Sequence, residues 1–251
     1  MLNISHLTKT YSGGKRAVDD LSLQVQAGEL YGFIGHNGAG KTTTLRAVAG
    51  ILAFDGGSIT IDGHDVVKEP VAAKRVTAFL PDNPDLYEFL SGIKFLEFIA
   101  DIYGIPADRR KTLIGKYADA FELTGVLGSP ISSYSHGMKQ KLALISAFIR
   151  EPRLMILDEP FVGLDPLASY RMKEFLHEIC QRGGAVFFST HVLEVAEKLC
   201  HKIAIIKDGR LVEAGRTADI VGKSSLEHVF LELAQESAGE AVPDFDSAEV
   251  K

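Results

Sequence analysis

Residues 35–42 form a glycine-rich run, Gly-His-Asn-Gly-Ala-Gly-Lys-Thr, whose residue types and spacing suit the binding of phosphate groups. The run fits the phosphate-loop pattern of a glycine, four further residues and then Gly-Lys-Thr. Residues 30–34 before it predict a strand, and residues 43–49 after it predict a helix. A strand, a tight turn and a helix N-terminus direct backbone N–H groups and the helix dipole at one anion. The run therefore predicts a site for a nucleoside triphosphate.

The parts of this loop have separate chemical tasks. The glycines allow left-handed torsions and let phosphates approach without a Cβ in the way. Lys41 can reach the β- and γ-phosphates, and the hydroxyl of Thr42 can coordinate Mg²⁺. A glycine-rich turn that holds no nucleotide is the alternative, which the Lys-Thr pair disfavours. We assign to nucleotide binding the residues Gly35, His36, Asn37, Gly38, Ala39, Gly40, Lys41, Thr42 and Thr43.

A pair of carboxylates, Asp158 and Glu159, comes at the end of the apolar run at 154–157. Four apolar residues suit a buried parallel strand, which delivers the pair to the edge where open α/β sheets bind ligands. Asp158 can hold Mg²⁺ directly or through water, and Glu159 can polarise the attacking water. An isolated acidic pair could equally be a helix cap or a solvated turn. Beside a phosphate loop we interpret it as catalytic.

Composition narrows the class of protein. The 251 residues are 46% hydrophobic and 24% charged with a net charge of −6, which disfavours a dedicated nucleic-acid binder. Two isolated cysteines, Cys180 and Cys200, form neither a disulfide framework nor a zinc site. The first residues lack the pattern of a signal peptide, and the longest apolar run is about half of the ~18 residues that a membrane span needs. We expect a cytoplasmic chain that reaches a membrane only through a partner.

The order of patterns predicts an α/β fold. Residues 1–65 indicate strands and turns around the phosphate loop, and a helical insert comes next at about 84–134. Strand and helix patterns then alternate, which predicts a parallel sheet flanked by helices. We predict one domain at 1–235, with a phosphate-loop core, an N-terminal antiparallel β portion and the helical insert. The acidic tail at 236–251 is expected to be disordered.

A third motif, Tyr-Ser-His-Gly-Met-Lys-Gln at 134–140, precedes Asp158 by about twenty residues. With the phosphate loop and the acidic pair, it makes the chain resemble the ATP-binding subunits of ATP-binding cassette (ABC) transporters over residues 2–235. The signature of that family is usually Leu-Ser-Gly-Gly-Gln, and Ser135 and Gly137 match it. The resemblance implies that Ser135, Gly137 and Met138 grip the γ-phosphate of ATP held by an opposite subunit. By itself the segment would be only a helix N-cap.

The resemblance implies roles for four further residues. Tyr11 would stack on adenine with Val18 beside the base, and Asp165 would lie at the dimer interface as part of the nucleotide site. His191, after the apolar strand at 185–188, would contact the γ-phosphate and help to hold the water. The implied cofactors are ATP and Mg²⁺.

One position departs from the family pattern. The strand at 76–80 is normally followed by a glutamine that touches Mg²⁺, whereas here Pro81 is followed by Asp82. A carboxylate is an adequate ligand for Mg²⁺, so we assign Asp82 to the metal, although it adds negative charge beside the triphosphate. This substitution, Met138 and the run at 225–230 look most like the ATPases of drug, antibiotic or small-ion export systems.

The implied function is ATP hydrolysis that powers transport, with export favoured, through a separate integral membrane permease at the inner face of the membrane. Two copies, or this chain and a related cassette, would close head to tail around two ATPs. No nucleic acid is expected as a partner. Two alternatives stay open: an ABC ATPase that acts away from membranes, and a catalytically weak regulatory cassette.

Overall fold

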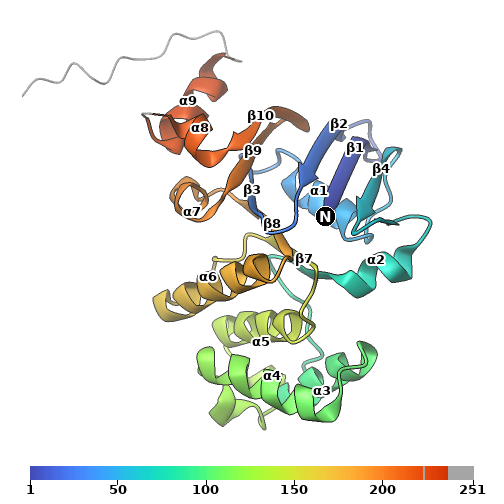
Figure 1. The fold of residues 1–251 in the computed structure, drawn as a ribbon, viewed down its shortest axis with the longest axis vertical. Coiled ribbons are helices and arrows are strands. Elements are labelled where there is room, and N and C mark those ends of the chain that lie inside the picture. The colour runs from blue at the N-terminus through green and yellow to red at the C-terminus, as the bar shows by residue number, and fades with distance from the viewer. Residues whose placement is uncertain (223, 237–251) are drawn as a thin grey trace, which may run out of the picture.

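The computed structural model describes residues 1–222 and 224–236, and all of the predicted acidic tail except Glu236 lies outside them. The chain is α/β, as predicted, and contains two sheets with a group of helices at one end (Figure 1). The helices within residues 92–148 occupy the lower end of the view, and the strands within residues 202–216 lie toward the upper end with the helices that follow them.

The first sheet is antiparallel and has the order β2-β1-β4-β5. Its strand β2 shows why the segment folds this way, because Leu21, Leu23 and Val25 are buried while Ser22 and Gln24 are exposed. This period of two buries one face against the core and leaves the other in solvent. The strands are β1 (Leu2–Thr10), β2 (Arg16–Val25), β4 (Gly56–Ile61) and β5 (His64–Asp65).

The second sheet has the order β10-β9-β3-β8-β7-β6, and all its strands are parallel except β10, which pairs antiparallel with β9. Every residue of β3, β7 and β8 is buried, as expected for strands covered on both faces. Because the strands are parallel, their carboxyl ends meet at one edge. The bounds are β3 (Leu30–Ile34), β6 (Thr77–Leu80), β7 (Leu154–Asp158), β8 (Ala185–Thr190), β9 (Lys202–Lys207) and β10 (Arg210–Arg216).

Two hydrophobic clusters cover the two faces of this sheet. Alternate residues of β3 divide between them: Leu30 and Ile34 face one cluster, and Tyr31 and Phe33 face the other. The second cluster lies between the sheet, the antiparallel strands and α1 (Lys41–Val48). The helices outside the insert are α2 (Pro70–Val76), α6 (Pro166–Gln181), α7 (Leu193–Leu199), α8 (Thr217–Val221) and α9 (Leu226–Glu236).

A helical lobe forms the lower end of the molecule and contains α3 (Gly92–Ile102), α4 (Ala107–Ala120) and α5 (His136–Phe148) (Figure 1). Two 3-10 turns, Thr124–Val126 and Ile131–Ser133, connect α4 to α5. The lobe belongs to the first hydrophobic cluster, together with α6 and the underside of the sheet. Its packing is aromatic: Phe148 is 5.3 Å from Tyr117 and 5.4 Å from Phe175 between ring centroids.

Arg150, just after α5, joins the lobe to the sheet. Its guanidinium lies 3.7 Å from the centroid of the Tyr103 ring and donates to the carbonyl of Thr77 at the start of β6. Burial lowers the pKa of Arg150 to about 10. The ring and the carbonyl stabilise its charge, and no carboxylate among the described residues forms an ion pair with it.

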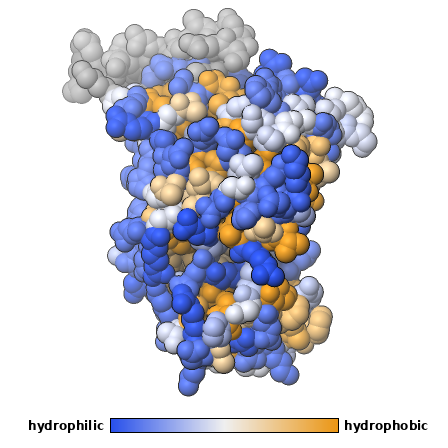
Figure 2. All heavy atoms as spheres, turned by 45° about the vertical axis from the view of Figure 1, so that its right-hand side comes forward, coloured by the Kyte–Doolittle hydropathy of each residue, from blue (hydrophilic) through white to orange (hydrophobic). Residues whose placement is uncertain are grey.

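Hydrophobic side chains reach the surface in separate patches. On the face shown in Figure 2 they appear between hydrophilic residues rather than as one continuous band. The most exposed aromatic residue of the described part is Phe89 at 82%, and Tyr87 beside it is 51% exposed. Their rings lie 6.0 Å apart in the loop before α3.

Candidate functional site

The loop between β3 and α1 is shaped by backbone contacts. A Cβ on Gly35 would lie 2.5 Å from the carbonyl oxygen of Ile206, and one on Gly40 would lie 2.3 Å from that of Ala17. Gly40 has a φ of 109° and is the N-cap of α1. Neither position can therefore carry a side chain without displacing a neighbouring strand end.

The turn between β9 and β10 supports this loop from behind. The N–H of Gly209 donates to the carbonyl of Ala39 at 2.9 Å, and the N–H of Asp19 donates to the carbonyl of Gly209 at 2.8 Å. Three segments that are far apart in the sequence thus meet at the loop through main-chain atoms. This support holds the loop open toward solvent, where a Cβ added to Gly38 would meet no atom within 4 Å.

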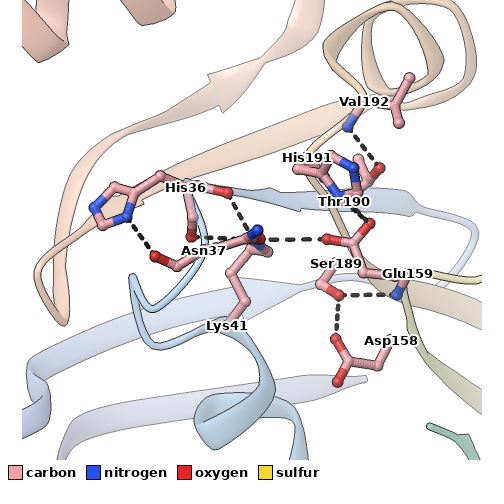
Figure 3. A network of polar contacts seen from close by, with 10 residues as sticks. His36, Asn37, Lys41, Asp158, Glu159, Ser189, Thr190, His191 and Val192 are labelled. Atoms are coloured by element: carbon pink, nitrogen blue, oxygen red, sulfur yellow. Dashed lines mark hydrogen bonds and ion pairs between the residues drawn. The ribbon is translucent and has the colours of Figure 1, made fainter. Parts of the chain in front are cut away.

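Lys41 is 7% exposed and points along the inside of the loop (Figure 3). Its Nζ donates to the carbonyl of Gly35 at 2.6 Å and to that of His36 at 3.2 Å. The same Nζ lies 3.6 Å from Oε1 of Glu159. The ammonium group therefore lies between the phosphate loop and the predicted catalytic carboxylate.

Asp158 is the last residue of β7, and only one of its two carboxylate oxygens accepts a hydrogen bond from the described residues. Its Oδ1 accepts a hydrogen bond from the hydroxyl of Ser189 on β8, which pairs with it in register. Its Oδ2 is buried and has no hydrogen-bond partner among the residues that the structure describes. A buried oxygen without a partner is costly unless a cation or water binds it. Asp158 therefore fits the role of a magnesium ligand.

Glu159 follows in an unusual conformation and is held by β8. Its φ of 47° lies in the left-handed region, which a non-glycine residue enters only when its surroundings enforce it. Its N–H donates to the carbonyl of Ser189 at 3.2 Å and to the Ser189 hydroxyl at 3.1 Å. These bonds turn the side chain away from the sheet and toward the loop.

His191 completes the group at the end of β8. Its Nδ1 lies 2.9 Å from Oε2 of Glu159, and its backbone N–H donates to the same oxygen at 3.2 Å (Figure 3). Glu159 therefore has Lys41 on one carboxylate oxygen and His191 on the other. This arrangement can hold a water molecule and accept its proton, which is the task of a general base.

Of these groups, Lys41 and Glu159 line a pocket of about 290 Å³ at the carboxyl edge of the sheet, and Asp158 and His191 do not line it. Tyr11 is 40% exposed in it, and its hydroxyl lies 3.3 Å from that of Thr43. The pocket is lined by Tyr11, Lys15, Ala17, His36, Asn37, Gly38, Gly40, Lys41, Thr42, Thr43, Asp82 and Glu159. A polar pocket at this edge, with a glycine loop, suits a phosphorylated ligand.

Within the described ranges, no three or more His, Cys, Asp or Glu side chains converge as they would in an all-protein metal site. Mg²⁺ needs no such cage, because one or two protein ligands, waters and substrate phosphates usually complete its shell. Thr42 and Asp82 in the pocket, with the free oxygen of Asp158, offer oxygen ligands of that kind.

The sequence model of the family described as ABC transporter matches residues 18–162. The chain belongs to this family. An uncharacterized ABC transporter ATP-binding protein of Nostoc is 38% identical over 83% of this chain, and the chain spans 62% of that protein. The daunorubicin/doxorubicin resistance ATP-binding protein DrrA of Streptomyces peucetius is 35% identical over 90% of this chain and 67% of its own length. A solved ATP-binding subunit of an ABC transporter has a TM-score of 0.89 and 33% identity, with 93% of this chain and 99% of that one covered.

As an ABC transporter ATP-binding subunit, the chain places part of its predicted machinery outside the pocket. Ser135 caps α5 by accepting from the N–H of Met138 at 3.3 Å. Asp165 caps α6 and pairs with Lys141 at 2.6 Å, and that contact lowers the pKa of the carboxyl. Ser135, Gly137, Met138 and Asp165 do not line the pocket. Their contact with nucleotide, which the resemblance implies, remains a prediction that involves a second chain.

Val18, Gly35 and Ala39 were assigned to the nucleotide but do not line the pocket, so their contact with it remains a prediction. Val18 is fully buried, and Ala17 lines the pocket in its place. Ala39 is also fully buried; its N–H donates to the carbonyl of His36 at 3.2 Å, and its carbonyl accepts from the N–H of Gly209 at 2.9 Å. Lys15 lines the pocket without having been predicted to, and Ser189 positions the two carboxylates. A serine at the end of the strand next to Asp158 was the signal that could have identified Ser189.

Across residues 1–222 and 224–236, none of the helices combines the length and the apolar character needed for a membrane span.

Proposed function

We propose that this chain is a magnesium-dependent ATPase that powers transport through a separate membrane permease. The observation that carries the proposal is the placement of Glu159 between Lys41 and His191, beside the phosphate loop. Few functions other than nucleotide hydrolysis require a restrained carboxylate next to a phosphate loop and its lysine. We further propose that residues 1–235 form one ABC ATPase domain, with the insert at 84–134.

In the proposed reaction the loop and Lys41 bind the β- and γ-phosphates, and Tyr11 stacks on adenine. Thr42, Asp158 and Asp82 would hold Mg²⁺, which when bound neutralises charge on the phosphate oxygens. Glu159 accepts a proton from the attacking water as that water approaches the γ-phosphate. His191 fixes the carboxylate of Glu159 and contacts the γ-phosphate.

A second cassette would complete each site. The positions of Ser135 and Gly137 outside the pocket support this, because the N-terminus of α5 is a ready anion site that this chain does not use for its own nucleotide. The γ-phosphate would bridge the two chains, so that ATP favours a closed dimer and hydrolysis reopens it. Met138 and Asp165 would lie at the same interface.

The permease would dock on the helical lobe and the loop at 81–86, at the inner face of the membrane. The exposed rings of Tyr87, Phe89 and Phe98 support this placement, because a cluster of exposed aromatic residues is typical of an interaction site. The direction proposed is export, which is supported by the similarity to a drug resistance protein.

The proposal is tested by replacing Glu159 with glutamine, which keeps the size and removes the base. Phosphate release should fall by ~10²–10⁴, while Mg-ATP binding persists and ATP drives dimerisation on a sizing column. Glu97→Gln, at an exposed position of α3, is the matched control and should leave turnover unchanged. Full turnover in Glu159→Gln would show that Glu159 is not the catalytic base.

Purification of the tagged chain from gently solubilised native membranes tests the transport step. A polytopic membrane protein in stoichiometric amount is expected with the chain. Recovery with ribosomes or DNA instead would contradict the transport function and leave the proposed ATPase activity unaffected.

A turnover assay of the wild-type chain tests the alternative of a regulatory cassette. ATP binding without hydrolysis would favour that alternative.

A further inference from the structure

Asp82 places a carboxylate in the nucleotide pocket at a point where a neutral side chain would suffice for binding metal. It follows β6 by two residues and so lies at the carboxyl edge of the sheet, opposite the phosphate loop. Its Oδ1 accepts a hydrogen bond from the N–H of Asn83 at 2.9 Å, which fixes the side chain on its own loop. The carboxylate therefore has a defined place in the pocket.

The charges that line this pocket cancel. Lys15 and Lys41 contribute two positive charges, and Asp82 and Glu159 contribute two negative charges. Lys41 is also engaged by Glu159 at 3.6 Å, so that part of its field is already balanced. Asp158, the buried residue before Glu159, adds a further carboxylate. A triphosphate without metal, with close to four negative charges, would enter a pocket whose ionic side chains offer it no net attraction.

A bound cation reverses this balance. If Thr42, Asp158 and Asp82 hold Mg²⁺, the cation would supply positive charge that attracts the carboxylate of Asp82, whereas metal-free phosphate oxygens would repel it. A unit charge about 5–7 Å away, at a dielectric constant between that of protein and water, changes an affinity by on the order of tenfold. The same group thus weakens the binding of the free nucleotide and strengthens that of its metal complex.

We propose that Asp82 makes this pocket discriminate between the magnesium complex of ATP and metal-free ATP. The inference rests on the proposed function and deepens it, because it names the form of the nucleotide that the chain accepts. Under this proposal, Asp82 is a specificity-determining residue as well as a metal ligand.

The test compares nucleotide affinity with excess Mg²⁺ and with excess EDTA, measured by isothermal titration calorimetry at fixed ionic strength. In Asp82→Asn the binding of metal-free ATP should tighten by about tenfold, and that of Mg-ATP should weaken. The ratio of the two dissociation constants should therefore fall by at least about tenfold. Asparagine retains the oxygen that accepts from Asn83, so the turn is preserved.

Asp85→Asn is the matched control, since Asp85 is an exposed carboxylate of the same loop that does not line the pocket. It should keep the wild-type ratio. An Asp82→Asn ratio equal to that of wild type would overturn the inference while leaving nucleotide binding intact. If the wild-type chain binds neither form of ATP, the proposed function itself fails.

Raising the salt concentration gives a second readout. Interactions between exposed charges are largely screened beyond about 8 Å at physiological ionic strength and beyond about 3 Å at 1 M salt. The discrimination of the wild-type chain should therefore shrink as the salt concentration is raised toward 1 M. The ratio for Asp82→Asn should change much less. An equal salt dependence in both proteins would contradict an electrostatic origin.

Discussion

The nucleotide pocket and the helical lobe are built on opposite physical principles. In the pocket, main-chain atoms approach so closely that Gly35 and Gly40 have no room for a Cβ. In the lobe, large rings fill the interior, and Phe148 at 1% exposure lies among Tyr117, Phe121 and Phe175. At Gly35 and Gly40 the loop therefore has no room for added atoms, whereas at Phe148 the lobe depends on a large side chain that fills its interior. Damage to the first should appear as lost binding, and damage to the second as lost stability.

Phe148→Ala tests the lobe and should have the largest effect. Removing a fully buried ring costs about 3–5 kcal/mol of unfolding free energy, which urea denaturation can measure. Nucleotide affinity should stay within about twofold under conditions where the variant is folded, since the ring lies in the cluster away from the loop. A parallel loss of affinity would show that the two regions are coupled.

Gly40→Ala tests the pocket. A φ of 109° and a contact of 2.3 Å with the Ala17 carbonyl force the loop to move, so ATP affinity should fall by about 100-fold, or ~3 kcal/mol. The global unfolding transition should shift by less than that of Phe148→Ala. Tight binding in this variant would contradict the description of the pocket as limited by main-chain contact.

Raising the pH tests the burial of Tyr117 in the lobe. Burial raises its pKa from the ordinary value of 10.0 to about 12. Between these values the folded chain retains a proton that the unfolded chain releases, so stability is present below pH 10 and is lost as the pH rises toward 12. The loss attributable to this group is ~2–3 kcal/mol, and Tyr117→Phe should reduce the slope. An unchanged slope in that variant would assign the alkaline loss to other groups.

Gly115→Ala is the small counterpart to Gly40→Ala. Gly115 lies within α4 and has nothing within 4 Å of an added Cβ. Alanine there should stabilise the chain by ~0.5–1 kcal/mol, because glycine loses more backbone entropy in a helix. The melting temperature should rise slightly while ATP affinity is unchanged. Destabilisation would mean that the lobe is also limited by close contact at this point.

Sequence analysis predicted those parts of the structure whose conformation is determined by a short segment of the chain. The phosphate loop, the strand before Asp158 and the strand before His191 are local patterns, and parallel pairing then brings their ends to one edge. The α/β class followed from the alternation of such patterns. The contacts of Ser135 and Asp165 with nucleotide remain predictions, since they require a second chain.

Details that depend on register or on an edge could not be predicted in the same way. The pairing of β1 with β2 shifts between Leu7 and Lys9, and a one-residue shift exchanges the two faces of a strand. This shift is why Ala17 lines the pocket while the next residue, Val18, is fully buried in the core. Strand β10 has no buried residue and no hydrophobic run from which it could have been predicted. It forms by hydrogen bonding to the unpaired edge of β9.

The turn at Asp208 and Gly209 bears on how this chain could change in evolution. A Cβ on Gly209 would lie 2.9 Å from the Ala17 carbonyl, and its own N–H holds Ala39. The length of this turn therefore determines where it contacts the phosphate loop, which lies some 170 positions earlier in the chain. One inserted residue between β9 and β10, in a hairpin that carries no catalytic side chain, would displace the nucleotide cradle. Insertions that surface hairpins ordinarily accept should be absent from this one.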